Sequence, residues 1–234
     1  QRQMCIRDSH LTHDITPYNT FEASYRLFQT VEYWPKGTTF VSVVDPGVGS
    51  SRKSVVALTK TGQYIVTPDN GTLSYIKKDV GIVAVREISE VENRCSNTEL
   101  SYTFHGRDVY AYTGAKLASG HISFEEVGPE LPVDKILEFP VVETIIEENL
   151  VRGAIDILDV RFGSLWTSIT RDDFYALEPN FGDRFEVTIF NNDMLVYQNQ
   201  VTYGKSFADV RIGQPIIYIN SLYRVGLAIN QGYF

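Results

Sequence analysis

The sequence is poor in cysteine, in cationic side chains and in long apolar runs. Its only cysteines, Cys5 and Cys95, cannot build a disulfide framework and lack zinc-site spacing, so a reducing cytoplasm is the expected location. The longest apolar runs, such as residues 215–219, are too short to span a bilayer, and no secretory apolar segment stands at the start. A net charge of −8 without a lysine and arginine stripe argues against binding to nucleic acid. What remains is an ordinary globular protein with neither a membrane nor a nucleic-acid partner.

The first part of the chain alternates helical and strand patterns. Apolar periodicity predicts helices over 20–34, 72–81 and 108–120, and buried strands over 39–45, 54–59, 64–68 and 81–88. Strands that alternate with helices are typical of an α/β domain whose mostly parallel sheet is covered on both faces. We therefore expect an α/β domain over residues 10–140.

From about Leu150 onward the pattern changes to short apolar runs separated by turns. Residues 191–193, Asn-Asn-Asp, lie between two such runs and predict a hairpin turn. Repeated short strands without long helices are typical of a small β-barrel or sandwich, so an all-β barrel domain is expected over residues 148–234. Residues 1–9, QRQMCIRDS, have no apolar period and are interpreted as a non-native or artefactual segment.

The loop VVDPGVGSSRK, residues 43–53, is the first candidate for a functional site. A Gly-rich loop after a strand can cradle a phosphate, but the G-x-G-x-x-G spacing and the G-K-[ST] ending are both missing. Asp45 stands where a predicted strand ends, the place where α/β sheets expose functional groups, and Arg52 follows seven residues later. The loop alone is explained equally well if Asp45 caps the turn and Arg52 is a solvated surface cation.

Three further segments contain residue types that suit a site. His105 lies in a Gly-containing loop before a helix, where a lone histidine is more often a structural residue than a site residue. The neighbouring Arg107 and Asp108 are expected to pair or to cap. The H-x-x-H-D pattern of residues 10–14 could bind a metal only with a third ligand from elsewhere, so no metal site is predicted. Residues 158–169 suit a flat aromatic ligand and equally an ordinary barrel corner.

Seven segments together resemble one family. They are HDITPYN, WPKGTTFVSVVDPGVGSSRK, TPDNGTL, TFHGRDVYAYTGAKLASG, VGPEL, ILDVRFGSLWTSI and INSLYRVGLAINQG, in order from about residue 12 to the C-terminus. In this order they resemble the S-adenosyl-L-methionine (SAM) hydroxide adenosyltransferases, or SAM hydrolases, which are related to fluorinase and chlorinase. The resemblance implies an α/β domain followed by a β-barrel. It also implies hydrolysis of SAM to adenosine and L-methionine by attack of water or hydroxide at C5′.

The resemblance extends to site residues and assembly. Asp45, Arg52 and His105 match the family residues that hold the attacking water. The matching substrate-binding positions are Tyr18, Asn70, Asp159, Phe162, Ser164, Phe207, Ser221 and Gln231. Family members are homotrimers in which the α/β domain of one subunit meets the barrel of its neighbour, with SAM between them. SAM is the implied substrate, and no cofactor is implied.

The matching positions carry different implied roles. Tyr18 is an aromatic wall beside the reacting centre, Asp159 meets the methionine ammonium group, and Ser221 lies near the methionine carboxylate. Leu222 replaces an arginine that fluorinase uses for that carboxylate. The remaining aromatic and polar positions of the second domain surround the adenine.

Two other functions stay open. Fluorinase has a tyrosine, a threonine and a serine in place of Asp45, Val48 and Gly106, and these belong to its halide pocket. Because a carboxylate repels a halide at contact distance, the resemblance favours hydrolysis over halogenation. The family's first strand–helix unit, with an aspartate that binds the ribose hydroxyls, is replaced here by QRQMCIRDS. A catalytically inactive member that binds adenosine or SAM is therefore the second alternative.

Overall fold

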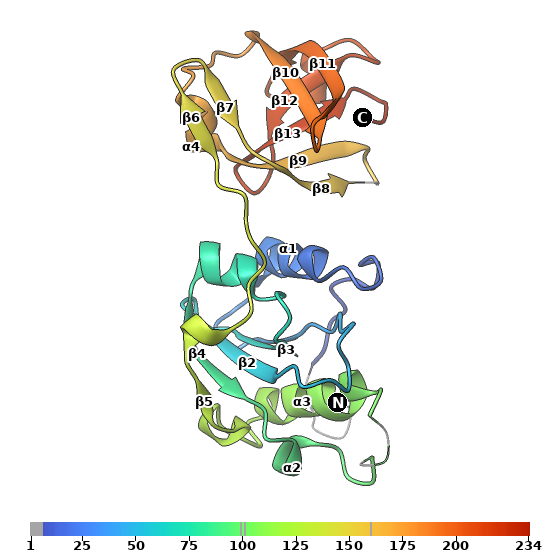
Figure 1. Cartoon of the computed structure of the whole chain (residues 1–234), viewed down its shortest axis with the longest axis vertical. Coiled ribbons are helices and arrows are strands. Elements are labelled where there is room, and N and C mark those ends of the chain that lie inside the picture. Colours follow the sequence, from blue (N-terminus) through green and yellow to red (C-terminus); the bar gives the residue numbers. More distant parts are fainter. Residues whose placement is uncertain (1–6, 99, 101, 160) are drawn as a thin grey trace. The chain divides into compact units, whose positions relative to one another are not determined.

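The computed structural model of the chain describes residues 7–98, 100, 102–159 and 161–234. The chain forms two compact units, Gln1–Phe139 and Pro140–Phe234, each with a core of its own (Figure 1). Residues 1–6 of the segment interpreted as non-native lie outside the described residues. In the ranges that are described, no helix has the length and apolar character that crossing a membrane requires.

A five-stranded mixed sheet forms the centre of the first unit. Its strands lie in the order β1 (Thr39–Val41), β3 (Tyr64–Pro68), β2 (Ser54–Thr59), β4 (Ile82–Glu87) and β5 (Glu130–Leu131). Strands β1 and β3 run parallel, whereas β2 is antiparallel to both β3 and β4, and β4 is antiparallel to β5. The prediction of a mostly parallel sheet is wrong. Residues 60–63, which join β2 to β3, are too few for a crossover and close a hairpin instead.

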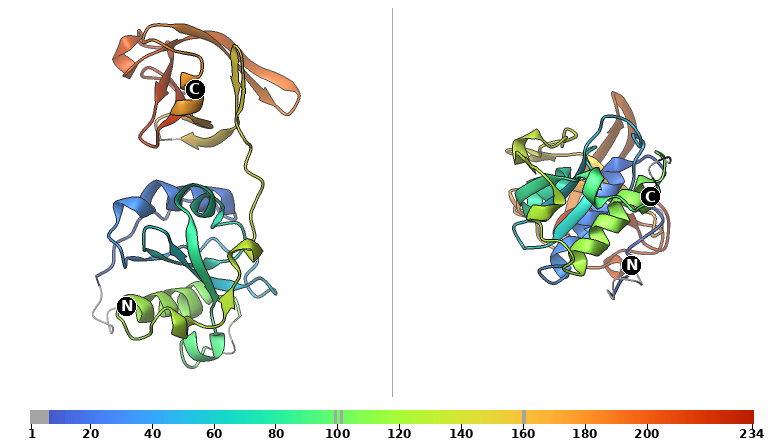
Figure 2. Two further views of the ribbon diagram at one scale, coloured as in Figure 1. Left: turned by 90° about the vertical axis from the view of Figure 1, so that its left-hand side faces the viewer. Right: turned by 90° about the horizontal axis from the view of Figure 1, so that it is seen from below.

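Helices cover both faces of this sheet (Figures 1 and 2). The helical elements of the unit are α1 (Thr20–Thr30), η2 (Val31–Tyr33), η3 (Ile76–Val80), α2 (Glu90–Asn93), η4 (Gly106–Ala111), α3 (Tyr112–Ala118), η5 (Glu125–Val127) and η6 (Val133–Lys135). Successive residues of β2 point to opposite faces, so Val55 packs in the core with Leu27 of α1, and Val56 packs in the core with Val109 of η4. The predicted helices over 20–34 and 108–120 are confirmed as α1 with η2 and as η4 with α3.

The second unit is built almost entirely of strands. They are β6 (Ile145–Glu147), β7 (Leu150–Arg152), β8 (Ile155–Asp159), β9 (Ser164–Thr170), β10 (Arg184–Asn191), β11 (Met194–Tyr203), β12 (Pro215–Ile219) and β13 (Arg224–Ile229), with α4 (Arg171–Tyr175) and the 3-10 turn η7 (Phe207–Asp209). The β6–β7 pair stands alone, and the other strands form one sheet in the order β10-β11-β12-β13-β9-β8. The predicted all-β character is confirmed.

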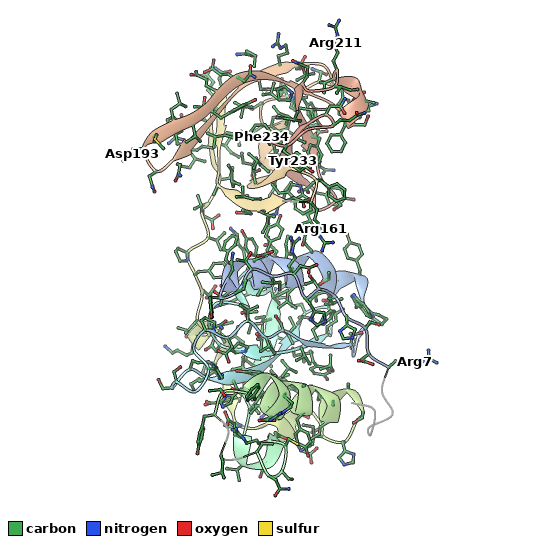
Figure 3. All side chains as sticks on the ribbon, turned by 90° about the vertical axis from the view of Figure 1, so that its right-hand side faces the viewer. Arg7, Arg161, Asp193, Arg211, Tyr233 and Phe234 are labelled. Atoms are coloured by element: carbon green, nitrogen blue, oxygen red, sulfur yellow. The ribbon has the colours of Figure 1, made fainter. Side chains whose placement is uncertain are left out.

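This second sheet is a half-barrel around a core that includes Phe174 of α4 and Val201 of β11. Among the described residues its outer strands, β8 and β10, do not pair with each other, so the sheet stays open where a β-barrel was expected. The hairpin predicted at 191–193 is confirmed: β10 and β11 pair antiparallel, and Asp193 lies at the tip (Figure 3). Asn192, with φ +53°, supplies the left-handed residue that this turn requires.

The close contact between α3 and β1 yields a stability prediction. A Cβ atom on Gly114 would lie 2.6 Å from Val41 Cγ2. Glycine to alanine inside a helix ordinarily stabilises by about 1 kcal/mol. Here we expect Gly114→Ala to lower the free energy of unfolding by about 1–3 kcal/mol in urea denaturation, because helix and strand must move apart.

The control is Val41→Ala, which removes the clashing methyl groups and should restore most of the lost stability when combined with Gly114→Ala. A Gly114→Ala protein as stable as the wild type would show that α3 does not need this close approach.

Candidate active site

The loop 42–53 leaves the end of β1 and returns to the start of β2. Gly49 has φ +77°, and a Cβ atom there would lie 3.2 Å from the Tyr102 carbonyl oxygen. Glycine therefore allows both the left-handed turn and the close approach of this loop to the segment that precedes η4. The turn brings Asp45 and Arg52 next to each other.

Asp45 and Arg52 form a buried, bidentate ion pair. Arg52 Nε donates to Asp45 Oδ1 at 2.8 Å, and Arg52 Nη2 donates to Asp45 Oδ2. Only 8% of the Arg52 side chain and 6% of the Asp45 side chain are exposed. Two parallel charge-assisted hydrogen bonds fix the plane of the guanidinium against that of the carboxylate. Arg52 is therefore not the solvated surface cation that the loop sequence alone allowed.

His105, the residue immediately before η4, contacts this ion pair. Its Nδ1 atom lies 3.2 Å from Arg52 Nη2 and 3.9 Å from Glu90 Oε1. Because a guanidinium can only donate, Nδ1 accepts, and the proton of a neutral imidazole is then on Nε2. The Nε2 atom is buried and has no hydrogen-bond partner among the described residues. The three predicted catalytic side chains are thus in contact, with one ring nitrogen left for another molecule.

Three further residues around Arg52 and His105 were missed by the sequence analysis. Arg52 Nη1 donates to Ser54 Oγ at 2.8 Å, and Ser54 Oγ lies 3.1 Å from the Tyr110 hydroxyl. Burial raises the pKa of Tyr110, so its hydroxyl stays protonated at neutral pH. The third residue, Glu90, also binds Arg94. The one available signal was spacing, because Ser54 and Tyr110 follow Arg52 and His105 closely in the chain.

Arg107 and Asp108 pair directly, as the sequence led us to expect. Arg107 Nε donates to Asp108 Oδ1 at 2.5 Å, and Nη2 donates to Oδ2 at 3.1 Å. The hydrogen bond from Arg107 lowers the pKa of the fully buried Asp108 carboxyl group. This pair lies in the first turn of η4 and makes no hydrogen bond with His105 among the described contacts.

Asn70 braces the backbone next to Asp45. Its Nδ2 donates to the Val44 carbonyl at 2.9 Å, and its Oδ1 accepts from Thr72 Oγ1 at 2.7 Å. The preceding residue, Asp69, accepts the Leu137 N–H at 2.8 Å, while burial raises its pKa. The turn after β3 therefore supports the loop that bears Asp45.

The remaining residues of interest in the first unit lie before α1. Tyr18 is 78% exposed and has φ +69°, so its ring is available to a ligand but makes no ring contact within the described residues. His10 Nδ1 and His13 Nε2 lie 2.8 Å apart and bond to each other. Within the described ranges, no group of three or more His, Cys, Asp or Glu side chains could hold a metal ion.

Three predicted ligands of the second unit lie at the turn between β8 and β9. Asp159 and Ser164 are partners across these strands, and Phe162 between them is 75% exposed while Ser164 is buried. Gly163, with φ +61°, lies against Tyr233, and the Phe234 N–H donates to the Gly163 carbonyl at 2.9 Å. The C-terminal residues, labelled in Figure 3, therefore brace this turn.

The other predicted ligands of the second unit lie on separate turns. Phe207 in η7 packs edge-to-face on Tyr218 at 5.2 Å, and the Tyr218 hydroxyl accepts from Trp166 Nε1 at 3.0 Å. Ser221 is exposed between β12 and β13, and Gln231 is exposed after β13. The structure thus brings together Asp45, Arg52 and His105 in one unit and groups Asp159, Phe162 and Ser164 at one turn of the other.

Each of the two units matches one domain of the same protein family. The model of the SAM hydroxide adenosyltransferase N-terminal domain matches residues 2–128, and the model of the C-terminal domain matches residues 153–234. The chain belongs to the SAM hydroxide adenosyltransferase family.

Individual relatives of the chain have different names. A Methanocaldococcus jannaschii protein named (R)-S-adenosyl-L-methionine hydrolase is 34% identical over 70% of this chain and 54% of its own length, so the chain spans about half of that relative. Fluorinase from Actinopolyspora mzabensis is 26% identical over 93% of this chain and 79% of its own. The crystal structure of an uncharacterized conserved protein from Thermotoga maritima matches with a TM-score of 0.90 at 31% identity, over 99% of this chain and 85% of that chain.

The buried ion pair yields a prediction that does not depend on activity. Asp45→Ala should lower the free energy of unfolding by about 3–5 kcal/mol, because it leaves the buried Arg52 guanidinium without its carboxylate. Arg52→Met added to Asp45→Ala should recover much of this loss, since an apolar side chain of similar length then fills the space. Urea denaturation of both single variants and the double variant measures the effect. Simple additivity of the two single losses would contradict a coupled, buried pair.

Proposed function

We propose that the chain hydrolyses S-adenosyl-L-methionine to adenosine and L-methionine. The observation that carries this proposal is the buried cluster in which Arg52 binds both Asp45 and His105. Membership in the SAM hydroxide adenosyltransferase family and the relative named (R)-S-adenosyl-L-methionine hydrolase support the choice of substrate. Because the sequence pattern divides the chain into an α/β part and an all-β part, we also propose that residues 10–140 and 148–234 are the domains that carry out this reaction in the cytoplasm.

The reaction needs help mainly at the nucleophile. A water oxygen bonds to C5′ while the C5′–S bond breaks, and the sulfonium sulfur keeps the bonding electron pair as the neutral thioether of methionine. The water gives up one proton. Neutral water is a weak nucleophile and hydroxide is scarce at pH 7, so a base for the proton and a cation near the developing hydroxide accelerate the step. Because the leaving group departs without charge, the proposed chemistry uses no metal and no redox cofactor.

The proposed roles of the cluster follow from its donors and acceptors. The Asp45 carboxylate keeps lone pairs beyond those that accept from Arg52 and serves as the proton acceptor. The Nε2–H of His105 holds the water oxygen, and the Arg52 charge stabilises the hydroxide as it forms. Arg52 has five N–H groups, and one on Nη1 has no partner in the described contacts. We assign this N–H a hydrogen bond to the oxygen of the attacking water.

Binding of the rest of SAM is proposed for the matching family positions. Tyr18 would lie beside the reacting centre, and Asn70 has a second amide N–H beyond the one that binds Val44. Asp159 would bind the methionine ammonium group and Ser221 would contact the carboxylate. The adenine would contact Phe162, Ser164, Phe207 and Gln231.

We propose that the active assembly is a homotrimer. The proposed water-holding residues belong to the first unit, whereas most of the proposed SAM-binding residues belong to the second. In a cyclic assembly with unlike surfaces meeting at each contact, one subunit's first unit and its neighbour's second unit can share a site. Ligand sites commonly form at such junctions.

Transfer of the adenosyl group to a halide is the second candidate function, favoured by the fluorinase relative. The buried carboxylate of Asp45 opposes it, because a second anion would have to enter beside it. A member that binds SAM or adenosine without turnover is the third candidate.

The products distinguish these candidates. We expect incubation of the chain with SAM in chloride and fluoride buffers to yield adenosine and methionine, detected by liquid chromatography. If a 5′-halogenated adenosine forms and adenosine does not, the reaction is halogenation and the proposed hydrolysis is wrong. Binding of adenosine in calorimetry, together with unchanged SAM, would indicate an inactive binding protein.

Substitutions should separate the chemical step from binding. Asp45→Asn keeps the shape of the side chain but removes the base, so kcat should fall about 10²–10⁴-fold while KM changes little. Phe207→Ala should raise KM about tenfold through lost stacking and leave kcat nearly unchanged.

Phe190→Ala, at an exposed phenylalanine outside the proposed set, is the matched control for Phe207→Ala. Circular dichroism confirms folding of each variant. Normal kcat with a large rise in KM for Asp45→Asn would make Asp45 a substrate ligand instead of the base.

A further inference from the structure

Two buried hydroxyl groups form a chain that begins at Nη1 of Arg52, the terminal nitrogen that does not bind Asp45. Ser54, at the start of β2, accepts from Arg52 Nη1 at 2.8 Å and lies 3.1 Å from the Tyr110 hydroxyl in η4. The Tyr110 ring also lies 5.5 Å from the guanidinium carbon of Arg52. Ser54 is 4% exposed and Tyr110 is fully buried. One strand and one helical turn therefore hold the same guanidinium.

An arginine can bind a carboxylate in two ways. It can offer Nε and Nη2, side-on, or the two terminal nitrogens Nη1 and Nη2, end-on. Here Arg52 offers Nε and Nη2 to Asp45, and this leaves Nη1 for Ser54 and directs Nη2 also toward His105. The end-on arrangement would take Nη1 away from Ser54 and rotate the guanidinium relative to His105. A partner at Nη1 therefore decides which arrangement is populated.

We propose that Ser54 and Tyr110 are positioning residues that hold Arg52 side-on, so that it bridges Asp45 and His105. The proposal rests on the hydrolysis proposed above, for which the bridge keeps His105 Nε2–H directed at the attacking water. Ser54 acts on Arg52 directly, and Tyr110 acts through Ser54.

The burial of both hydroxyls explains why they hold one arrangement. A hydroxyl without access to water loses a hydrogen bond outright when its protein partner moves away. Ser54 is the described hydrogen-bond partner of the Tyr110 hydroxyl, so rotation of Arg52 would disturb both groups. Linked hydrogen bonds of this kind strengthen one another in a buried environment.

The decisive comparison is Ser54→Thr against Ser54→Val. Both variants make the side chain β-branched and both suit a strand, but only threonine keeps the hydroxyl, which valine replaces by a second methyl group. We expect Ser54→Thr to keep a kcat near that of the wild type, and Ser54→Val to lose about 10- to 100-fold in kcat with little change in KM. Tyr110→Phe keeps the ring and loses only the hydroxyl, so its kcat should fall about 3- to 10-fold.

Ser24→Ala is the control for loss of a buried serine hydroxyl. Ser24 lies in α1, is fully buried, and accepts the Tyr75 N–H at 3.0 Å. Its loss should lower the free energy of unfolding without changing kcat. Equal losses of kcat in Ser54→Thr and Ser54→Val would assign the effect to the added methyl group and overturn the proposal.

Nitrogen-15 NMR of His105 provides a measurement that does not need turnover. With four histidines in the chain, His105 can be assigned by substitution of the other three. The wild type and Ser54→Thr should show an unprotonated Nδ1 and a protonated Nε2, whereas Ser54→Val should show a mixture of tautomers. An unchanged tautomer together with an unchanged kcat in Ser54→Val would overturn the proposal. A tautomer change in a chain that makes no adenosine would support the positioning role and refute the hydrolysis.

Discussion

The buried guanidinium of Arg52 places the strongest constraint on the first unit. A charge with so little exposure to water is tolerated only if carboxylate, ring nitrogen and hydroxyl partners surround it. Asp45, His105 and Ser54 supply these partners from the loop after β1, the start of η4 and the start of β2. Three separate parts of the chain must therefore meet at one point, and much of the local structure follows from that requirement.

The direction of the strands makes this meeting possible. Strand β1 is parallel to β3, and β2 is antiparallel to β3, so the end of β1 and the start of β2 lie at the same edge of the sheet. Loop 42–53 passes between them across the end of β3, where Asn70 binds the Val44 carbonyl. In the parallel arrangement expected from the sequence, the start of β2 would lie at the opposite edge, and Arg52 could not reach Asp45 through so short a loop.

In the second unit, the C-terminal residues support the turn that is proposed to bind SAM. Its proposed SAM-binding turn between β8 and β9 bears exposed Phe162, and an exposed turn needs support to keep one shape. Gly163 lets Tyr233 pack directly against the backbone, and the Phe234 N–H binds the Gly163 carbonyl. The end of the chain is thus part of the framework of this turn. In both units, a loop or turn that bears proposed site residues is held by a hydrogen bond from a neighbouring segment to one of its backbone carbonyl groups.

Local features of the protein were determined by the sequence. The apolar stripe of α1, the 191–193 hairpin and the all-β character of the second unit depend on neighbouring residues, and periodicity and turn chemistry report them directly. The motif residues Asp45, Arg52 and His105 were also identifiable there. Strand direction, the open edge of the half-barrel and the roles of Ser54 and Tyr110 were decided only by the tertiary structure. A hydrophobic pattern reports which side of a strand is buried but carries no information about which strand lies beside it or which nitrogen of a guanidinium meets a distant hydroxyl.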